Sequence, residues 1–255
     1  MSEHVVMTDI DDGVLIITLN RPAAKNAVNK AVAEGIAAAI DELESNSALR
    51  VAILTGAGGT FCSGMDLKAF VTGELPIVEG RGFAGLCEYT PAKPLIAAIE
   101  GYALAGGFEL AISCDLVVAA DDAKFGIPEV KRGLAAGAGG LVKLPKQIPS
   151  RIAKELALTG DFISAHRAFD LGLINEVVPA GSALDAAKVL ARKIAANGQL
   201  AVALSKQVVD GAQDWNSAEM FAKQQAIIQP VFTSEDAIEG ATAFAEKRAP
   251  QWKGR

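Results

Sequence analysis

Histidine is scarce in this sequence, which has only His4 and His166 among its 255 residues. His4 stands in the N-terminal tail, and His166 falls in a segment predicted to be a surface helix. A Ser-His-Asp or Cys-His nucleophilic site is therefore hard to assemble. A metal centre is equally disfavoured, so no metal site is expected.

Cysteine is almost as scarce. The sequence has three, Cys62, Cys87 and Cys114, an odd number at spacings unlike those of a zinc site. They predict reduced thiols, and Cys62 and Cys114 are predicted to be small buried apolar side chains. Because the N-terminal residues show neither an apolar signal core nor an Arg-rich transit pattern, a cytoplasmic location is expected.

Basic residues are outnumbered, with 24 Lys and Arg against 30 Asp and Glu and a net charge of −6. Nucleic-acid binding depends on neutralising phosphates with basic side chains, so an extended nucleic-acid surface is disfavoured. A local basic pocket remains compatible with this balance.

One run, residues 95–120, is apolar enough to raise the alternative of a membrane span. Glu100, Glu109 and Asp115 lie inside this run, and each would cost roughly 3 kcal/mol at the centre of a bilayer. A buried core is the better interpretation, and no membrane partner is expected.

Apolar residues, in contrast, make up 51% of the chain, enough to bury a large core. Strand and helix signals alternate up to about residue 195, and only helix signals follow. We therefore predict two units, residues 1–195 as the core and residues 196–255 as a C-terminal helical segment. Pro179-Ala-Gly181 and Asn197-Gly198 mark breaks near this boundary.

The first elements follow from hydrophobic periodicity. Residues 14–20 predict a strand, and an amphipathic helix is predicted from about Asn29. Residues 50–59 predict a buried strand that enters a glycine turn. This turn superficially resembles a dinucleotide-binding loop, but Phe61 stands where the third glycine belongs.

The central stretch, residues 101–140, carries two acids in apolar surroundings, Glu109 and Glu129. Buried carboxyls are costly unless they are hydrogen-bonded or protonated, so the pair predicts chemistry. Gly106 stands where a strand should give way to a helix N-terminus, which offers unpaired N–H groups to an oxyanion. Two simpler interpretations stay open at this point: Glu109 as a capping acid at the third helical position, and Pro128-Glu129 as an ordinary helix start.

A second glycine-led segment is TFCSGMDLKAF, with Gly64 before a short helix predicted over residues 65–70. Taken alone, it is compatible with a tight turn in which Asp66 is a helix-start acid. Taken with Gly106, it predicts two backbone N–H groups aimed at one point, which a carbonyl acquiring negative charge requires.

The sequence contains four linked motifs, FCSGMDLK, GYALAGGFELAISCD, FGIPEVKRGL and ISAHRAFDLGLINEVVP. In their order and approximate spacing they resemble the crotonase, or enoyl-CoA hydratase/isomerase, superfamily, and the match runs over essentially the whole chain. The resemblance implies an α/β fold, a spiral of repeated ββα units that forms an acyl-CoA-binding catalytic core. It also implies a C-terminal helical trimerisation segment, and hence a homotrimer or a dimer of trimers.

The resemblance also implies roles for individual residues. The backbone N–H groups of Met65 and Gly106 match the oxyanion hole for a thioester carbonyl, and Glu109 and Glu129 match the two catalytic glutamates of the hydratases. Residues that match substrate-binding positions are Ser63, Gly64, Asp66, Leu67, Lys68 and Gly107. Arg21, Lys25 and Lys68 are candidates for the CoA phosphates, with solvated surface charges as the alternative. Residues 71–90 match part of an acyl pocket.

Retention of both glutamates favours hydration. One group must deprotonate water while another exchanges a proton with carbon, whereas a double-bond shift can use one carboxyl. The predicted activity is reversible syn hydration of a 2,3-enoyl-CoA to 3-hydroxyacyl-CoA, with no cofactor besides the CoA of the substrate. Enoyl-CoA isomerisation and non-catalytic acyl-CoA binding stay open. Residues 105–109, AGGFE, resemble carnitinyl-CoA dehydratase-like members. Residues 134–140 lack the proline that often precedes the matching segment in the family, so the acyl group is left open.

Overall fold

Strands and helices alternate along residues 4–255, the part of the chain that this computed structural model describes. The strands are β1 (Val6–Asp11), β2 (Val14–Leu19), β3 (Val51–Gly56), β4 (Ile77–Val78), β5 (Gly82–Phe83), β6 (Leu95–Ile99), β7 (Tyr102–Leu104), β8 (Leu116–Ala120), β9 (Lys124–Gly126), β10 (Ile163–Ser164) and β11 (Glu176–Val178). The α-helices are α1 (Lys30–Ser45), α2 (Leu67–Val71), α3 (Gly106–Ala111), α4 (Gly140–Gln147), α5 (Ser150–Thr159), α6 (Ala165–Asp170), α7 (Ala183–Ala195), α8 (Gln199–Ala212), α9 (Met220–Phe232) and α10 (Glu235–Glu246). Two 3₁₀ turns, η1 (Pro22–Ala24) and η2 (Pro128–Arg132), complete the set.

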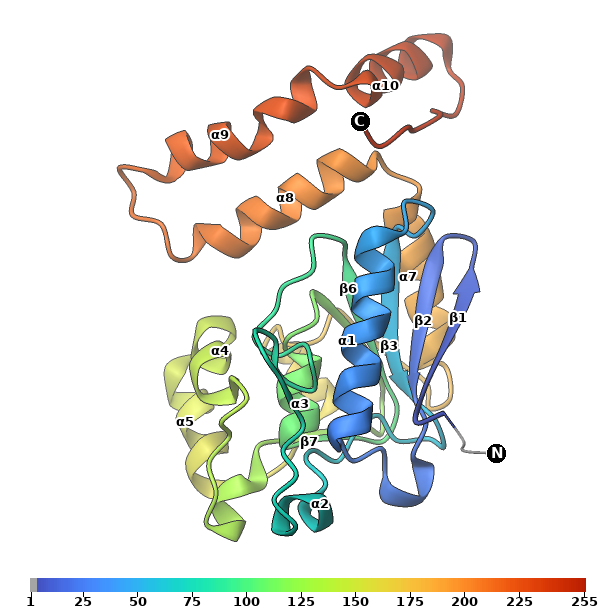
Figure 1. Cartoon of the computed structure of the whole chain (residues 1–255). Coiled ribbons are helices and arrows are strands. Elements are labelled where there is room, and N and C mark those ends of the chain that lie inside the picture. The colour runs from blue at the N-terminus through green and yellow to red at the C-terminus, as the bar shows by residue number, and fades with distance from the viewer. Residues whose placement is uncertain (1–3) are drawn as a thin grey trace.

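The main sheet has six strands in the order β1-β2-β3-β6-β8-β11. Only the β1–β2 pair is antiparallel, and the other neighbours are parallel. Parallel sheets need cover on both faces, which explains the continuous apolar runs of β2, β3 and β6. α1 covers one face and α7 the other (Figure 1). The sheet is therefore the rigid layer from which the loops project.

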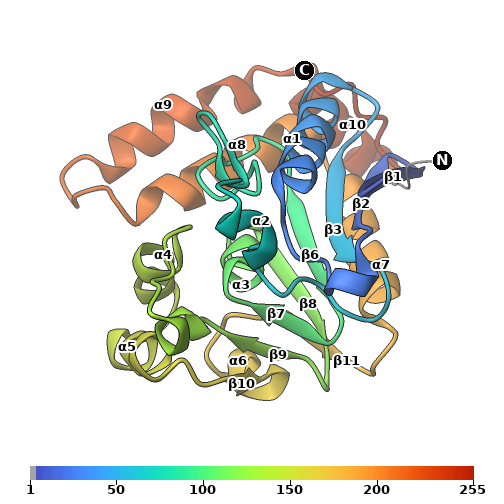
Figure 2. The ribbon, with the colours of Figure 1, turned by 60° about the horizontal axis from the view of Figure 1, so that its bottom comes forward.

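A smaller sheet, in the order β10-β9-β7, stands next to the main one (Figure 2). β7 leads directly into α3, and a bridge between Cys62 and Ala103 ties the loop after β3 to β7. Phe108 of α3 packs edge-on against Phe125 of β9, with ring centroids 5.7 Å apart. These contacts fix the start of α3 beside the segment that precedes α2.

Several of these elements were predicted from the sequence. The strand expected over residues 14–20 is β2, and the helix expected from Asn29 is α1, whose first turn is capped by the Asn29 side chain. Two details differ. The short helix expected from residue 65 begins at Leu67, because the Asp66 side chain accepts hydrogen bonds from the next turn. Ala105 is the N-cap of α3, so Glu109 is the fourth helical residue and not the third.

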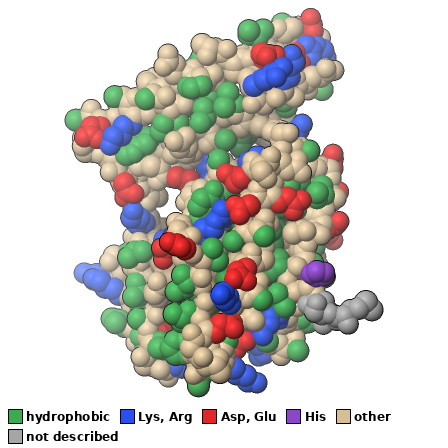
Figure 3. Space-filling view, viewed as in Figure 1, with side chains coloured by type: hydrophobic (Ala, Val, Ile, Leu, Met, Phe, Trp, Pro, Cys, Tyr) green, Lys and Arg blue, Asp and Glu red, His purple; other side chains and the backbone are tan. Residues whose placement is uncertain are grey.

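The C-terminal helices α8 and α9 form a separate layer across one end of the molecule (Figure 1). No residue of either helix is buried. Hydrophobic side chains are visible over this layer in Figure 3. Phe221 and Phe232 of α9 are among the exposed large hydrophobic residues of the described chain. The predicted boundary after residue 195 falls at the end of α7, although the division into two units stays a prediction. Within residues 4–255, no helix is long and apolar enough to cross a membrane.

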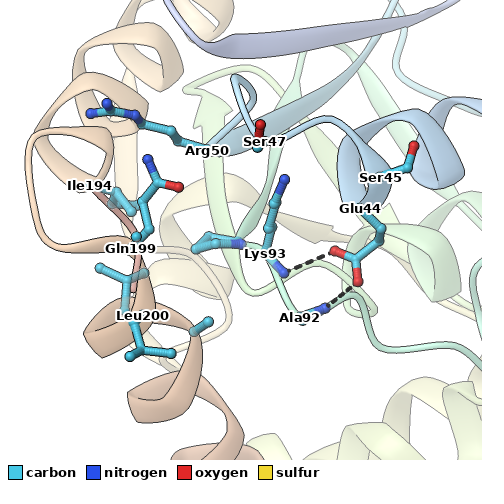
Figure 4. A pocket seen from close by; sticks show the side chains of 13 residues that line it. Glu44, Ser45, Ser47, Arg50, Ala92, Lys93, Ile194, Gln199 and Leu200 are labelled. Carbon is cyan, nitrogen blue, oxygen red and sulfur yellow. Dashed lines mark hydrogen bonds between the residues drawn. The ribbon is translucent and has the colours of Figure 1, made fainter. Parts of the chain in front are cut away.

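A cavity of about 330 Å³ lies where the core meets α8 (Figure 4). Its charged side chains are all engaged in structural contacts. Glu44 accepts hydrogen bonds from the N–H groups of Ala92 and Lys93. The Lys93 ammonium donates to two carbonyls at the end of α1, and Arg50 donates to the carbonyl of Ala195. Cations at helix C-termini are stabilising, so this cavity is a structural junction.

Candidate active site

The predicted catalytic residues meet in one cavity of about 710 Å³. Met65, Gly106, Glu109 and Glu129 all line it. They come from the loop before α2, from α3 and from η2, segments up to 64 positions apart in the sequence. The structure therefore brings together the four residues that sequence reasoning placed at one site.

The backbones at Gly64 and Gly106 are in direct contact. A Cβ atom built on Gly64 would lie 3.1 Å from the Gly106 nitrogen and 2.8 Å from the Ala105 Cβ, and Gly64 has a φ of +101°. A larger residue at position 64 would separate the two segments. Within residues 4–255, the N–H groups of Met65 and Gly106 donate to no other group. Two free backbone donors on adjoining segments fit an oxyanion site.

Ala105 holds the strained backbone of this site. Its φ of 52° and ψ of −130° are unfavourable for a residue with a Cβ. Its N–H donates to the carbonyl of Gly126, which holds β7 against β9 at the point where the chain turns into α3. The strain is therefore located at the residue that directs the Gly106 N–H.

Gly106 and Gly107 are glycines because their neighbours leave no room. A Cβ on Gly106 would lie 2.5 Å from the Phe83 ring, and a Cβ on Gly107 would lie 2.2 Å from the Cys62 carbonyl oxygen. Gly107 is absent from the cavity wall. The substrate-binding role predicted for Gly107 stays a prediction, and the contact that the structure shows for it is packing against Cys62.

Glu109 is 2% exposed and is held by two backbone donors. Its Oε1 accepts hydrogen bonds from the N–H groups of Ala138 and Gly140, each at 2.8 Å. Burial raises the pKa of Glu109, and these two hydrogen bonds and the Lys143 ammonium act against that rise. Its Oε2 accepts no hydrogen bond from residues 4–255, so one oxygen is fixed and the other is available to a ligand.

Glu129 differs from Glu109 in that no other residue of the described chain donates a hydrogen bond to its carboxylate. Its Oε2 is buried and has no hydrogen-bond partner within the described chain. Burial raises the pKa of Glu129 to about 7, and the nearby carboxylate of Glu109 adds to the rise. A carboxyl with a pKa near neutrality can both release and accept a proton under ordinary conditions.

The raised pKa of Glu129 predicts how stability depends on pH. Since the folded state favours the neutral carboxyl, the associated stability is complete below the ordinary pKa of 4.5 and is lost as pH rises through about 7. Glu129→Gln stays neutral throughout. We therefore expect its melting temperature to rise relative to wild type between pH 5 and pH 8, measured by calorimetry. A difference that stays constant over this range would contradict the assignment.

The predicted substrate-binding residues divide into two groups. Lys25, Ser63 and Leu67 line the cavity, and Lys25 stands over the Tyr102 ring at 5.4 Å. Arg21 and Asp66 are instead bound to each other at 2.9 Å and do not line the cavity. Gly64 lies behind the cavity wall, and Lys68 is exposed on α2.

The Arg21 guanidinium is engaged inside the protein. It donates to Asp66 and to the carbonyl of Ala27. Asp66 in turn caps α2, which is the role of a helix-start acid that the sequence allowed for it. The structure thus gives Arg21 and Asp66 a structural contact, and their predicted contacts with substrate stay predictions.

Sequence reasoning missed several residues of the cavity and its surroundings. Tyr102 and Arg132 line the cavity, and Lys143 supports it from behind. Residues 71–90, predicted as part of an acyl pocket, contribute Leu75, Pro76, Ile77, Phe83 and Glu88 to the wall. Nothing in the local pattern around Lys143 distinguishes it from an ordinary helix lysine. Within residues 4–255, no three His, Cys, Asp or Glu side chains are grouped so that they could hold a metal ion.

Comparison with known proteins gives consistent results. The model of the enoyl-CoA hydratase/isomerase family matches residues 9–255. A carnitinyl-CoA dehydratase from Proteus mirabilis is 41% identical over 250 residues, which cover 95% of each chain.

Solved structures agree with the sequence comparison. An enoyl-CoA hydratase from Mycobacterium tuberculosis is 59% identical with a TM-score of 0.97, covering 99% of this chain and 100% of that one. A carnitinyl-CoA hydratase from Mycobacterium avium is 44% identical with a TM-score of 0.80, covering 100% of both chains. The predicted crotonase-like α/β fold is confirmed, and the chain belongs to the enoyl-CoA hydratase/isomerase family.

Proposed function

We propose that the protein is an enoyl-CoA hydratase, which adds water reversibly across the 2,3 double bond of an enoyl-CoA thioester. The observation that carries this proposal is the shared cavity of Glu109 and Glu129, faced by two free backbone donors. Hydration needs two acid–base groups and stabilisation of an enolate, and the cavity offers both. No cofactor is required beyond the CoA of the substrate.

In the proposed mechanism, the N–H groups of Met65 and Gly106 hold the thioester oxygen. Glu109, as a carboxylate, holds a water through its free Oε2, and together with the protonated carboxyl of Glu129 it orients that water toward C3. The water oxygen bonds to C3 as its proton passes to the Glu109 carboxylate, and the electron pair of the double bond moves into the thioester enolate. Glu129 then donates its own proton to C2 on the same face, and transfer of the proton from Glu109 to Glu129 restores both groups. The reverse sequence removes water from 3-hydroxyacyl-CoA.

The decisive experiment mixes the purified protein with crotonyl-CoA and with longer and branched 2,3-enoyl-CoAs. We expect the absorbance of the conjugated thioester to fall as the double bond is hydrated. Saturable binding of these thioesters without turnover across the panel would instead identify an acyl-CoA-binding protein. Movement of a 3,4 double bond into conjugation, with no hydration, would identify an isomerase.

A second candidate activity is the dehydration of carnitinyl-CoA. It is favoured by the names of the Proteus mirabilis and Mycobacterium avium relatives and by the AGGFE sequence at residues 105–109. The same catalytic groups would serve, because dehydration is the reverse of hydration. Carnitinyl-CoA belongs in the panel, and a kcat/KM for it well above that for every unsubstituted acyl chain would favour this second activity.

We also propose that the chain assembles as a homotrimer or a dimer of trimers through residues 196–255. The support is the lack of buried residues in α8 and α9, whose exposed apolar side chains the single chain leaves uncovered. Light scattering coupled to size-exclusion chromatography tests this assembly, and a monodisperse monomer would contradict it.

A further inference from the structure

Lys143, on the first turns of α4, lies behind the catalytic cavity and not in it. Its side chain is half-buried, and its ammonium donates two hydrogen bonds. One goes to the carbonyl of Cys87 at 2.7 Å and the other to Ser113 Oγ at 2.8 Å. A half-buried lysine with two fixed acceptors has lost much of its side-chain freedom, and these contacts must outweigh that loss.

The acceptor Ser113 connects Lys143 to the backbone of Glu109. Its hydroxyl donates to the Glu109 carbonyl oxygen at 2.7 Å. The chain of contacts therefore runs from the Lys143 ammonium through one hydroxyl to the residue whose carboxylate faces the cavity. Lys143 is thus tied to α3, although it belongs to α4.

On its other side, Lys143 belongs to the turn that holds the Glu109 carboxylate. Its N–H donates to the carbonyl of Gly139 at 2.8 Å, and its stem runs over Gly139, where an added Cβ would lie 3.4 Å from Cδ and Cε. The neighbouring N–H of Gly140 donates to Glu109 Oε1. Lys143 therefore contacts both the turn whose N–H groups hold the Glu109 carboxylate and, through Ser113, the helix that carries Glu109.

The charge of Lys143 acts in the same direction as its hydrogen bonds. Glu109 and Glu88 are the carboxylates that favour the charged form of Lys143, and the thiols of Cys87 and Cys114 also face it. Burial raises the pKa of Cys87 to about 12 and that of Cys114 further, so neither thiol titrates near neutrality. Burial lowers the pKa of Lys143 itself, and its neighbours work against this loss of charge. The carboxyl that faces Glu109 from η2 is Glu129.

We propose that Lys143 is a positioning residue for the reaction: it clamps α4 to α3 and supplies the positive charge that keeps Glu109 a carboxylate with one oxygen fixed. This inference rests on the proposed hydratase function, since it assigns Glu109 the task of holding the water. Lys143 touches neither substrate nor water in this scheme. It acts through the donors and the charge around Glu109.

The test compares Lys143→Met with Lys143→Arg over the pH range of hydration. In Lys143→Met, the missing charge raises the pKa of Glu109, so the acid limb of the kcat profile should move to higher pH by about one unit. The maximal kcat should also fall about 10-fold with little change in KM, since the group is misplaced and not removed. Lys143→Arg keeps the charge but not the geometry, so its acid limb should stay near that of wild type while kcat falls.

Lys146→Met is the matched control. It removes the same group from the same helix, but Lys146 is exposed and pairs with Asp214. We expect wild-type kinetics and a wild-type acid limb. An acid limb in folded Lys143→Met that coincides with that of wild type would overturn the inference.

Two additional measurements cover the cases in which the comparison of these variants cannot be read. If Lys143→Met does not fold, Ser113→Ala removes the relay to Glu109 and should lower kcat several-fold at constant KM, whereas wild-type kcat would overturn the inference. If the wild-type protein hydrates no enoyl-CoA, the proposed function fails by itself. The Glu109 pKa is then read by carbon NMR of protein labelled at the glutamate carboxyl carbon, with Glu109→Gln for assignment. A pKa that is the same in wild type and in Lys143→Met would overturn the inference.

Discussion

Glu109→Gln and Glu129→Gln should each lose at least 100-fold in enoyl-CoA hydration. Glutamine keeps the size and hydrogen-bonding capacity of glutamate but removes its acid–base function, which is typically worth about 10²- to 10⁴-fold in rate. At position 109 the amide oxygen can still accept from the N–H groups of Ala138 and Gly140, so the turn before α4 should keep its place. The measurement is kcat for the best substrate in the panel, together with the Kd for a non-reactive acyl-CoA.

The two variants should differ in a second measurement. Because Glu129 is assigned to the proton at C2, Glu129→Gln should also slow solvent deuterium exchange at the α-carbon of the substrate. Glu155→Gln, on the exposed side of α5, is the control for loss of a carboxyl and should match wild type. Near-normal hydration in either purified active-site variant would place the chemistry elsewhere in the cavity.

Gly107→Ala should be damaging although it adds only one methyl group behind the cavity. The new Cβ would lie 2.2 Å from the Cys62 carbonyl oxygen and 2.8 Å from the Cys62 carbonyl carbon. Backbone atoms cannot rotate away, so α3 and the Cys62–Met65 segment must separate. We expect a loss of about 2–3 kcal/mol in the free energy of unfolding, and hence a melting temperature lower by roughly 5–10 °C. Since the two N–H donors lie on the separated segments, hydration should fall about 10²- to 10³-fold.

The matched control for this prediction is Gly137→Ala. Gly137 is exposed, and the nearest atom to an added Cβ is the Ala135 carbonyl oxygen at 3.8 Å. Its free energy of unfolding should stay within about 0.5 kcal/mol of wild type. If Gly107→Ala is as stable as Gly137→Ala and hydrates at the wild-type rate, the close approach of α3 to Cys62 is not required for the site.

The site was predictable to the extent that its signal is local. Glycines and carboxyls are conspicuous in apolar runs, so Gly106, Glu109 and Glu129 could be picked out from residues 101–140 alone. The strand and helix periods likewise predicted β2, α1 and β3. The arrangement of the strands and helices into a spiral of ββα units was predicted from the family resemblance, because hydrophobic periodicity alone does not show how elements are arranged. Comparison with solved structures confirmed that fold.

Contacts between segments far apart in the sequence could not be predicted from it. Arg21 looked like a candidate for a phosphate because its partner Asp66 lies 45 positions away, and sequence spacing does not show that the two pair. Lys143 occupies an ordinary position in an amphipathic helix, and its acceptors lie 30 and 56 positions away. The positive φ of Ala105 was equally hidden, because alanine carries no local signal for a left-handed backbone.

The C-terminal layer of α8 and α9 has little packing within the chain to hold its helices. Isolated helices of the length of α8 and α9, 14 and 13 residues, are marginal in water. Phe221 and Phe232, at 67% and 71% exposure, gain little protection from the described chain. If copies of the chain associate through this layer, mass action links the order of α8 and α9 to protein concentration. In dilute solution these two helices should then be the first part of the chain to fray and to be cut by proteases, while the sheet that carries the catalytic cavity is still folded.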